Sequence, residues 1–350
     1  MFEHEYIGNL HIHSYYSDGV YSVSEIAGSA VKAGLDFICI NDHDFMTPSL
    51  HLQEEGFYGN LLVLMGLEIG KRHHHYLAYD IREMIKGDNL GPQEVIDQVN
   101  EQGGFGFLAH PFERGMPFRD KSVAYTWEDR SVKDFTGIDL WNFSSRWKER
   151  IKSVFHGLFF LMFPHQTLKG PSKETLYFWD DLCQERRVAA LGGSDAHAAQ
   201  FRWGPIRLRP FTYEYLLGTI NIHILLHKYM PLNFKQAKKE VYQAMREGHL
   251  FIAHDGLCPA KGFRFDYMAD DGSNLFMGEE GDFHGGNLVI ELPYPGEIRL
   301  IKDGYLLKKW QGMEAAFRVT EKGIYRVEAY RRLSFFGWRP WIFSNPIYLR

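Results

Sequence analysis

The sequence contains few cysteines, and their spacing gives no sign of disulfide bonds. Only three of the 350 residues are cysteines, Cys39, Cys183 and Cys258. An odd number without a short repeated spacing excludes the disulfide framework of small secreted proteins. Cys39 lies in the apolar run at residues 37–40 and fits a position in the core. We therefore expect a protein of a reducing compartment, with the cytoplasm as the default location.

Long apolar segments are also missing. The two most apolar stretches, residues 154–163 and 215–226, are too short to span a bilayer and are interrupted by polar residues. The first residues lack the charged and then apolar pattern of a signal peptide. These absences predict a protein without a membrane partner.

An excess of positive charge is absent as well. The chain has 39 Lys and Arg against 44 Asp and Glu, a formal net charge of -5. No general attraction to nucleic acid or to a membrane follows, although a local basic patch can still exist. The 45% hydrophobic and 24% charged content is typical of a globular protein. The length suits one large domain with a small one.

Short apolar runs alternate with helical patterns over the first two hundred residues. The runs at 35–40, 61–65, 105–109 and 188–191 each end in polar residues. Helical patterns lie between them, and this alternation indicates parallel β/α units. The site of a β/α barrel is built from the carboxyl ends of its strands. We therefore expect polar residues that are distant in sequence to meet in one site.

The pattern is helical over residues 143–187, which we interpret as an insertion. Its apolar residues at helical spacing favour a core position or a wall of the cleft, and they are Trp147, Ile151, Val154, Phe155 and Leu158. We place the first domain at residues 1–262, including this insertion.

After residue 262 the helical periodicity disappears. Short strand patterns occur at 289–292, 298–301, 317–319, 324–330 and 341–348, with turn signals at Pro295-Gly296 and Asp303-Gly304 between them. Such a series predicts a small antiparallel β-sandwich over residues 263–350.

His11-x-His13 is the first candidate site. Side chains two apart on a strand share one face, so both imidazoles can bind one divalent metal, with Asp18 nearby. The alternative is a pair of histidines that merely decorate a strand end. Similar residues recur after later apolar runs, and the candidate ligands are His11, His13, Asp18, His43, Glu68, His110, Asp195 and His197. Imidazoles and carboxylates without thiolates favour Zn, Mn or Fe.

Five blocks in this order resemble the PHP (polymerase and histidinol phosphatase) family from about residue 6 to about residue 260. They are His11-x-His13, Asp42-His43, Gly66-Leu67-Glu68, Ala109-His110-Pro111 and Gly193-Ser194-Asp195-Ala196-His197. The resemblance implies a distorted (β/α)₇ barrel with two or three metals at the carboxyl ends of its strands. It also implies hydrolysis of phosphoesters, with a small phosphorylated metabolite, a nucleotide or a nucleic-acid end as substrate.

The resemblance also implies a distribution of the ligands. His11, His13, Glu68 and Asp195 would hold one metal, and Glu68 would bridge to a second metal that His110 binds. A third metal would be held by Asp18, His43 and His197.

The chain departs from the trinuclear pattern at Asn142. Some relatives offer a histidine after this strand, whereas Asp139 and Asn142 stand here. An asparagine is a poor ligand for Zn-type ions, so we expect the second metal to bind weakly.

Three further residues are candidates for catalysis. Asp42 can orient the ligand rings, or it can be a solvated loop carboxylate. His75 can reach the substrate and protonate the leaving group. Arg202 can hold a phosphate with two hydrogen bonds, or it can be a surface arginine. His223 lies in an apolar stretch and fits a core histidine with satisfied hydrogen bonds.

These features predict a metal-dependent phosphoesterase in which a metal-activated hydroxide attacks phosphorus. One alternative is a metal-dependent amidohydrolase acting on a C–N bond, since such enzymes also begin with His-x-His and end with a metal-binding Asp. Another is a non-catalytic binding module. Glu68 and the Asp195-x-His197 pair favour the phosphoesterase.

Overall fold

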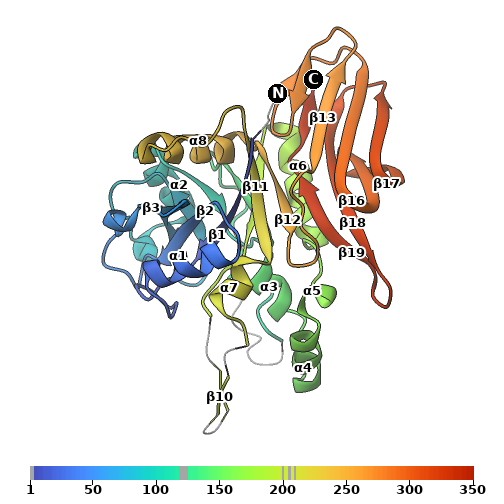
Figure 1. Ribbon diagram of the computed structural model, residues 1–350. Helices are drawn as coiled ribbons and strands as arrows, with labels where there is room; N and C mark the ends of the chain where they lie inside the picture. Colours follow the sequence, from blue (N-terminus) through green and yellow to red (C-terminus); the bar gives the residue numbers. More distant parts are fainter. Residues whose placement is uncertain (1–3, 118–124, 199–200, 204–205, 209) are drawn as a thin grey trace.

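The computed structural model describes residues 4–350 apart from 118–124, 199–200, 204–205 and 209, and it leaves out the side chains of 201–203 and 206–208. Figure 1 shows two parts side by side. The helices are α1 (Val23–Lys32), α2 (Pro92–Glu101), α3 (Phe143–Lys148), α4 (Val154–Met162), α5 (Pro164–Thr167), α6 (Lys173–Glu185), α7 (Tyr213–Leu217) and α8 (Phe234–Glu247), with short 3₁₀ turns at Leu52–Glu54 and Gly87–Asn89.

The strands of the first part run from β1 to β12. They are β1 (His4–Ile12), β2 (Phe37–His43), β3 (Gly56–Tyr58), β4 (Leu61–Ile69), β5 (Tyr76–Tyr79), β6 (Phe105–Leu108), β7 (Gly137–Asn142), β8 (Ala189–Gly193), β9 (Phe201–Trp203), β10 (Ile206–Leu208), β11 (Ile220–Leu226) and β12 (Leu250–His254).

Seven strands of this part form a closed ring, in the order β1, β2, β4, β5, β6, β7 and β8. β1, β2 and β4 are parallel, as are β6, β7 and β8. β5 runs antiparallel to both β4 and β6. Backbone hydrogen bonds of Ala196 with His11 (3.1 Å) and His13 (2.9 Å) join the end of β8 to β1. The expected α/β class is confirmed, but β5 departs from a regular succession of β/α units, and the exact (β/α)₇ barrel stays a prediction.

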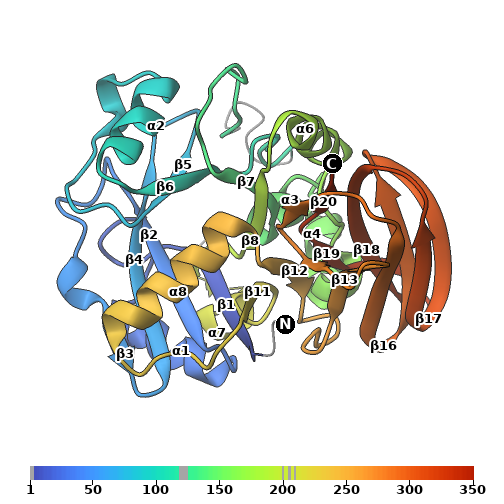
Figure 2. The ribbon, with the colours of Figure 1, turned by 90° about the horizontal axis from the view of Figure 1, so that it is seen from above.

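Amphipathic helices cover the outside of these strands. α1 begins after Ser22, whose hydroxyl accepts from the Glu25 amide while the Glu25 carboxylate accepts from the Ser22 amide. Its buried side, which includes Ile26 and Ala30, faces β2 and β4. Figure 2 looks down on α8, which lies across the end of the strands opposite to α3 and α4.

The C-terminal part is built from mainly antiparallel strands around its own hydrophobic core. These strands are β13 (Arg264–Ala269), β14 (Asn274–Phe276), β15 (Glu280–Gly281), β16 (Gly286–Lys302), β17 (Tyr305–Val319), β18 (Gly323–Leu333), β19 (Gly337–Ser344) and β20 (Ile347–Leu349). β19 pairs with β12, so a continuous 18-stranded sheet includes both parts. The predicted separate sandwich is not confirmed, and the boundary at residue 262 stays a prediction.

One of the two predicted turns in this part is wrong. β16 continues through Pro295-Gly296, where its pairing with β17 is irregular between Glu291 and Gly296. The proline is accommodated at a bulge and does not end the strand. The other turn is present at Asp303-Gly304, which joins β16 to β17 with φ angles of 50° and 81°. Two positive φ angles are typical of a two-residue hairpin turn.

Buried polar contacts connect the two parts. The Asn345 side chain accepts from the Ala190 amide (2.7 Å) and donates to the carbonyls of Ala190 and Leu250. Arg326 donates two hydrogen bonds to Asp180 on α6, at 2.7 and 2.9 Å. Because these groups are buried, separating the parts would leave several of them without partners.

The insertion at 143–187 is helical as predicted and contains α3 to α6. The prediction for its apolar residues is only partly right. Ile151 is buried, whereas Val154, Phe155 and Leu158 on α4 are exposed. Among the described residues, no helix is both long and apolar enough to cross a bilayer.

Candidate metal centre

His11 and His13 converge as expected, but through an unusual backbone. The ring centroids of the two histidines are 5.2 Å apart. His11 has a φ of 61°, and the pairing of β1 with β2 is irregular between Asn9 and Ile12. Regular strand alternation therefore does not explain the convergence. His110 (φ 28°) and Asp195 (φ 50°) share this left-handed type of backbone, which clusters at functional sites.

Glu68 lies at the centre of the cluster and is buried at the end of β4. Its Oε2 atom is 3.1 Å from His11 Nε2, 3.2 Å from His13 Nε2 and 3.2 Å from His43 Nδ1. Its Oε1 atom is 2.6 Å from His75 Nδ1 and 3.3 Å from His110 Nε2. Two oxygens that each face imidazoles suit a carboxylate that bridges two metal ions.

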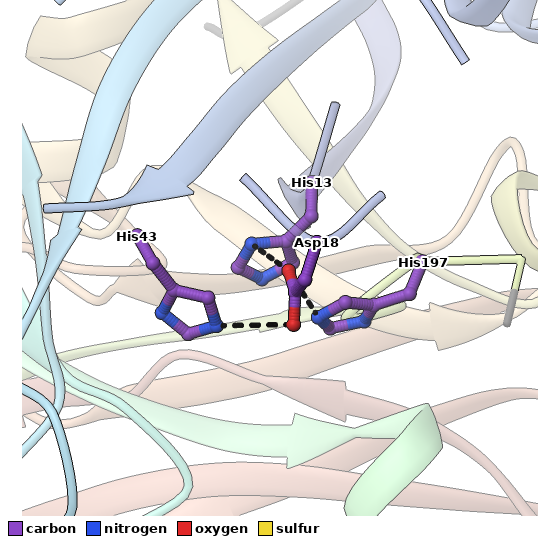
Figure 3. Close-up of side chains that lie close together, drawn as sticks. All are labelled: His13, Asp18, His43 and His197. Atoms are coloured by element: carbon purple, nitrogen blue, oxygen red, sulfur yellow. Dashed lines mark ion pairs between the residues drawn. The ribbon is translucent and has the colours of Figure 1, made fainter. Parts of the chain in front are cut away.

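Asp18 forms a second focus beside Glu68 (Figure 3). The figure shows its carboxylate among the rings of three histidines. The distances are 3.6 Å to His13 Nδ1, 3.7 Å to His43 Nε2 and 3.2 Å to His197 Nε2. The Asp18 side chain is 40% exposed, so this side of the cluster is open to solvent.

Asp195 connects these two groups. Its Oδ1 atom is 3.6 Å from His11 Nε2, 3.4 Å from His13 Nε2 and 3.4 Å from His197 Nδ1. His110 also belongs to this group, because its ligand atom, that of His11 and that of Asp195 all lie within 4.8 Å of one another. All eight predicted ligands are thus brought together.

The cluster fits divalent metal ions. Several ring nitrogens and Glu68 Oε2 are buried without a hydrogen-bond partner, although buried polar atoms nearly always have one. The donors are imidazoles and carboxylates without a thiolate, the set that suits Zn, Mn and Fe. Four groups have ligand atoms close enough to share an ion, namely His13, Asp18, His43 and His197; His11, His110 and Asp195; His11, His13 and Glu68; and His43, Glu68 and His75.

The protein groups by themselves shift the pKa values of neighbouring candidate ligands in different directions. Burial opposes ionisation of Glu68, but the facing histidines hold the pKa of this carboxyl well below its usual range. Burial would lower the pKa of His13, yet the facing carboxylates of Asp195 and Glu68 raise it to about 10. Burial lowers the pKa of His43 to about 3. A metal bound by His13 would therefore displace a proton, which makes binding pH-dependent.

A cavity of about 350 Å³ opens beside the cluster. Its lining includes the candidate ligands Asp18, Glu68 and Asp195, and it also includes the aromatic side chains of Phe143, Trp147 and Phe211. A family model for the PHP domain matches residues 9–262 of this chain.

The chain belongs to the PHP family.

Three known proteins are similar to parts of this chain or to its fold. An uncharacterised protein, MJ1587, of Methanocaldococcus jannaschii is 28% identical over 116 residues, which is 30% of this chain and 67% of that protein. A two-domain protein from Bacteroides vulgatus contains a predicted PHP-like metal-dependent phosphoesterase. Its structure aligns over 97% of this chain and 95% of its own, with 14% identity and a TM-score of 0.47.

The third is a Bifidobacterium adolescentis protein whose assignment as a metal-dependent phosphoesterase is provisional. It covers 54% of this chain and 87% of its own, with 14% identity and a TM-score of 0.30. Both TM-scores are below 0.5, so the family assignment rests on the PHP domain model alone.

The PHP cluster has one member more than the sequence predicts among its ligands. His75 is 3% exposed, its Nδ1 atom lies 2.6 Å from Glu68, and its Nε2 atom is buried without a partner. It also lines the cavity. The structure thus places His75 within the ligand cluster, and its expected contact with substrate stays a prediction.

Asp42 and Asn142 both accept hydrogen bonds from backbone amides beside the ligand cluster. Asp42 accepts hydrogen bonds from the Ser14 amide (2.8 Å), the Ser14 hydroxyl (2.7 Å) and the Ser17 hydroxyl (2.5 Å). It therefore holds the loop that carries Asp18. The Asn142 oxygen accepts from the Ser145 amide (2.9 Å) and caps α3, which leaves only the NH₂ group facing His11 Nδ1 at 3.4 Å.

Sequence reasoning missed the ion pair in the cavity wall. Lys148 lies 2.7 Å from Glu113, and the Ser145 hydroxyl also donates to Glu113. Burial opposes the charge of Lys148, but Glu113 and Asp195 raise its pKa. The position of Glu113 three residues after His110 is a weak sign in the sequence that it belongs to the site. Nothing in the sequence marks Lys148. Arg202 lies on β9, and its side chain is outside the described part.

Proposed function

We propose that this protein is a phosphoesterase of the PHP type that uses two or three divalent metal ions to hydrolyse a phosphate ester. The observation that carries the proposal is the buried Glu68 carboxylate, faced by five imidazoles and opening onto a cavity. No packing requirement explains so many buried ring nitrogens without partners.

We assign the ligands as follows. One ion would be held by His11, His13, Glu68 and Asp195, a second by Glu68 and His110 and a third by Asp18, His43 and His197, with His75 as an added ligand beside Glu68. Bound Mn, Zn or Fe would activate water and neutralise charge on the phosphoryl oxygens. Asp195 lies near His11 and His110, whereas the Asn142 oxygen is used by the Ser145 amide. These positions support Asp195, and not Asn142, as the group that completes the second site.

Lys148 is our candidate for binding the phosphate. It is the one Lys or Arg among the described residues that line the cavity. Glu113 holds its ammonium group in place, and a cation beside a phosphoryl group stabilises the charge that develops in the transition state. Arg202 remains a second candidate for this role.

The cavity walls also bear on the substrate. The lining of the cavity includes five aromatic side chains, those of Phe45, Tyr125, Phe143, Trp147 and Phe211. Aromatic walls suit a leaving group with a flat or apolar portion, and bases stack on such side chains. A nucleotide, an oligonucleotide end or a small phosphorylated metabolite fits this description.

The test is a screen for phosphate release with Mn²⁺ over nucleotides, sugar phosphates and short oligonucleotides, with amides alongside. We expect hydrolysis of at least one ester, loss of activity with a chelator, and recovery with Mn²⁺ or Zn²⁺. The exposed His73 lies outside the cluster, so His73→Ala is a control that keeps full activity. Full activity in a verified metal-free protein would contradict the proposal, and cleavage of amides alone would favour an amidohydrolase.

We also propose a division of labour within the fold. Residues 1–262 would form the distorted (β/α)₇ barrel that holds the metals, and residues 263–350 would form a sandwich that supports it. The candidate ligands all precede residue 262, which supports this division. The three free cysteines are consistent with a reducing cytoplasm.

A further inference from the structure

Helix α4 exposes an unusual amount of apolar surface. Phe155 is 83% exposed and Met162 is 71% exposed, and Val154, Leu158, Phe159 and Leu161 are exposed as well. In Figure 1, α4 extends from the end of the molecule opposite to α8. A contiguous exposed apolar surface on a soluble fold marks an interaction site.

A second element extends this surface. The hairpin between β18 and β19 carries Phe335, which is 97% exposed, and Phe336, whose ring lies 5.5 Å from that of Phe163 at the end of α4. We call the exposed apolar residues of α4 together with Phe335 the apolar tip. Two elements distant in sequence therefore contribute to one surface.

Basic residues surround the apolar tip. The segment from residue 146 to residue 173 contains six Lys and Arg and a single acidic residue, although the whole chain has a net charge of -5. Four cationic side chains define what we call the basic collar, and they are Arg150, Lys152, Lys169 and Arg339. Within the described part of the chain, none of the four forms an ion pair with a carboxylate.

Two guanidinium groups of the basic collar bind neighbouring backbone carbonyls. Arg150 donates to the Thr167 carbonyl and Arg339 to the Gln166 carbonyl, so both guanidinium groups lie near the base of α4. An open hollow next to α4 is lined by Arg114, Glu149, Arg150, Lys152, His156 and Phe160. A hollow with three cationic side chains and one carboxylate favours an anionic group.

We propose that the apolar tip and the basic collar bind the surface of an anionic lipid bilayer. The apolar side chains of α4 would enter the boundary between headgroups and acyl chains, and the collar would contact lipid phosphates. A nine-residue helix is about 13 Å long, so α4 would lie at the surface and not span the membrane.

A second copy of this chain fits the surface less well. In a two-fold dimer the same surface of both copies forms the interface. The basic collar of one copy would therefore lie close to the basic collar of the other. Anionic lipid complements both the apolar tip and the collar. The sequence-based expectation of no membrane partner rested on the absence of spanning segments and of a signal peptide, and on a net charge that left a local basic patch open.

The first experiment is sedimentation of the full chain with vesicles of phosphatidylcholine containing 30% phosphatidylserine, beside vesicles of phosphatidylcholine alone. We expect binding that depends on phosphatidylserine and weakens with salt. The double variant Phe155→Ser, Met162→Ser should bind at least tenfold more weakly. Leu232→Ser removes an equally apolar residue that is 95% exposed outside the apolar tip, and it should bind as the unmodified chain does.

Charge reversal tests the collar separately. Lys152→Glu with Lys169→Glu should weaken binding by at least fivefold for each residue, because one basic residue near an anionic surface contributes about that factor. Lys235→Glu with Lys239→Glu makes the same change of net charge on α8, at the opposite end of the molecule in Figure 1. That control should keep most of the binding.

Light scattering completes the test, because it measures the oligomeric state of each variant. Vesicle binding by a monomer, lost in both test variants, supports the proposal. Absence of phosphatidylserine-dependent binding overturns it. A dimer that Phe155→Ser dissociates, without vesicle binding, also overturns it and assigns the apolar tip to self-association. Unchanged thermal unfolding shows that the exposed substitutions leave the fold intact.

Discussion

Two buried histidines of this chain, His13 and His223, differ in how their ring nitrogens are used. His223 on β11 lies 2.7 Å from Glu5 and 2.9 Å from Asp255, so both nitrogens have a carboxylate partner. Both nitrogens of His13 lack a hydrogen-bond partner, although three carboxylates lie within 3.6 Å. A histidine that stabilises the fold has its bonds satisfied, whereas a ligand keeps nitrogens available for something that binds.

The largest expected effect tests the ligand side of this comparison. His13→Ala should lower the rate of phosphate release by about 10³-fold, since it removes a donor shared by two of the candidate metal groups. The metal content should fall together with the rate, because the ring offers nitrogens to both groups. Elemental analysis and an assay of phosphate release measure the two. Unchanged metal content would remove His13 from the ligands.

His223→Ala should lower stability and leave activity in place. It leaves the carboxylates of Glu5 and Asp255 buried without their shared partner, which costs about 3–4 kcal/mol of unfolding free energy. Activity per folded molecule should stay near that of the unmodified chain. Urea unfolding with activity assays checks this pair of outcomes. If His223→Ala instead removed a metal, the distinction between the two histidines would fail.

The pH dependence of stability should also distinguish His223. Burial would lower its pKa, but Asp255 and Glu5 raise it to about 9. The folded state thus holds this proton more tightly than the unfolded chain, where the pKa is about 6.5. Its contribution, about 3 kcal/mol, is fully present below pH 6.5 and is lost as the pH rises through 9.

Urea unfolding of the unmodified chain and of His223→Gln, both between pH 6 and pH 9.5, measures this contribution. The difference in stability between the two should narrow as the pH rises. A difference that is independent of pH would show that His223 is neutral in the folded protein.

The smallest expected effect concerns the support of a ligand. Asp139 Oδ2 lies 3.7 Å from His11 Nδ1 and accepts from Asn142 (3.2 Å), so it orients both side chains. Asp139→Asn should weaken metal binding by about 10–100-fold, as loss of such a partner typically does. Titration with a competing chelator measures it, and Asp129→Asn on the surface is the control. Equal affinity in both variants would exclude the role of Asp139.

The left-handed backbone of the ligands was beyond sequence reasoning. His11, His110 and Asp195 reach the cluster through positive φ angles, although the two-residue spacing of His11 and His13 suggested a regular strand end. Backbone hydrogen bonds between β1 and the end of β8 tie together the segments that carry His11 and Asp195. Such contacts join residues almost two hundred positions apart, so no local pattern reports them.

The exposure of apolar residues in the helical insertion was also beyond sequence reasoning. Phe155 and Leu158 recur at helical spacing, and that periodicity is identical for a helix that faces the core and for one that faces outward. Lys148 likewise resembles any lysine of a helix until its pairing with Glu113 places it in the cavity wall.

The sequence by itself determined the α/β class of the first part and the eight candidate ligands that converge, because residue type and position after an apolar run are local properties. Only the tertiary structure decided that β5 runs backward, that β16 continues through Pro295-Gly296, that His75 faces Glu68 and that α4 stays uncovered. The physical reason is that strand direction, cavity lining and burial depend on which segments pair and pack, and those partners are set by the whole chain at once.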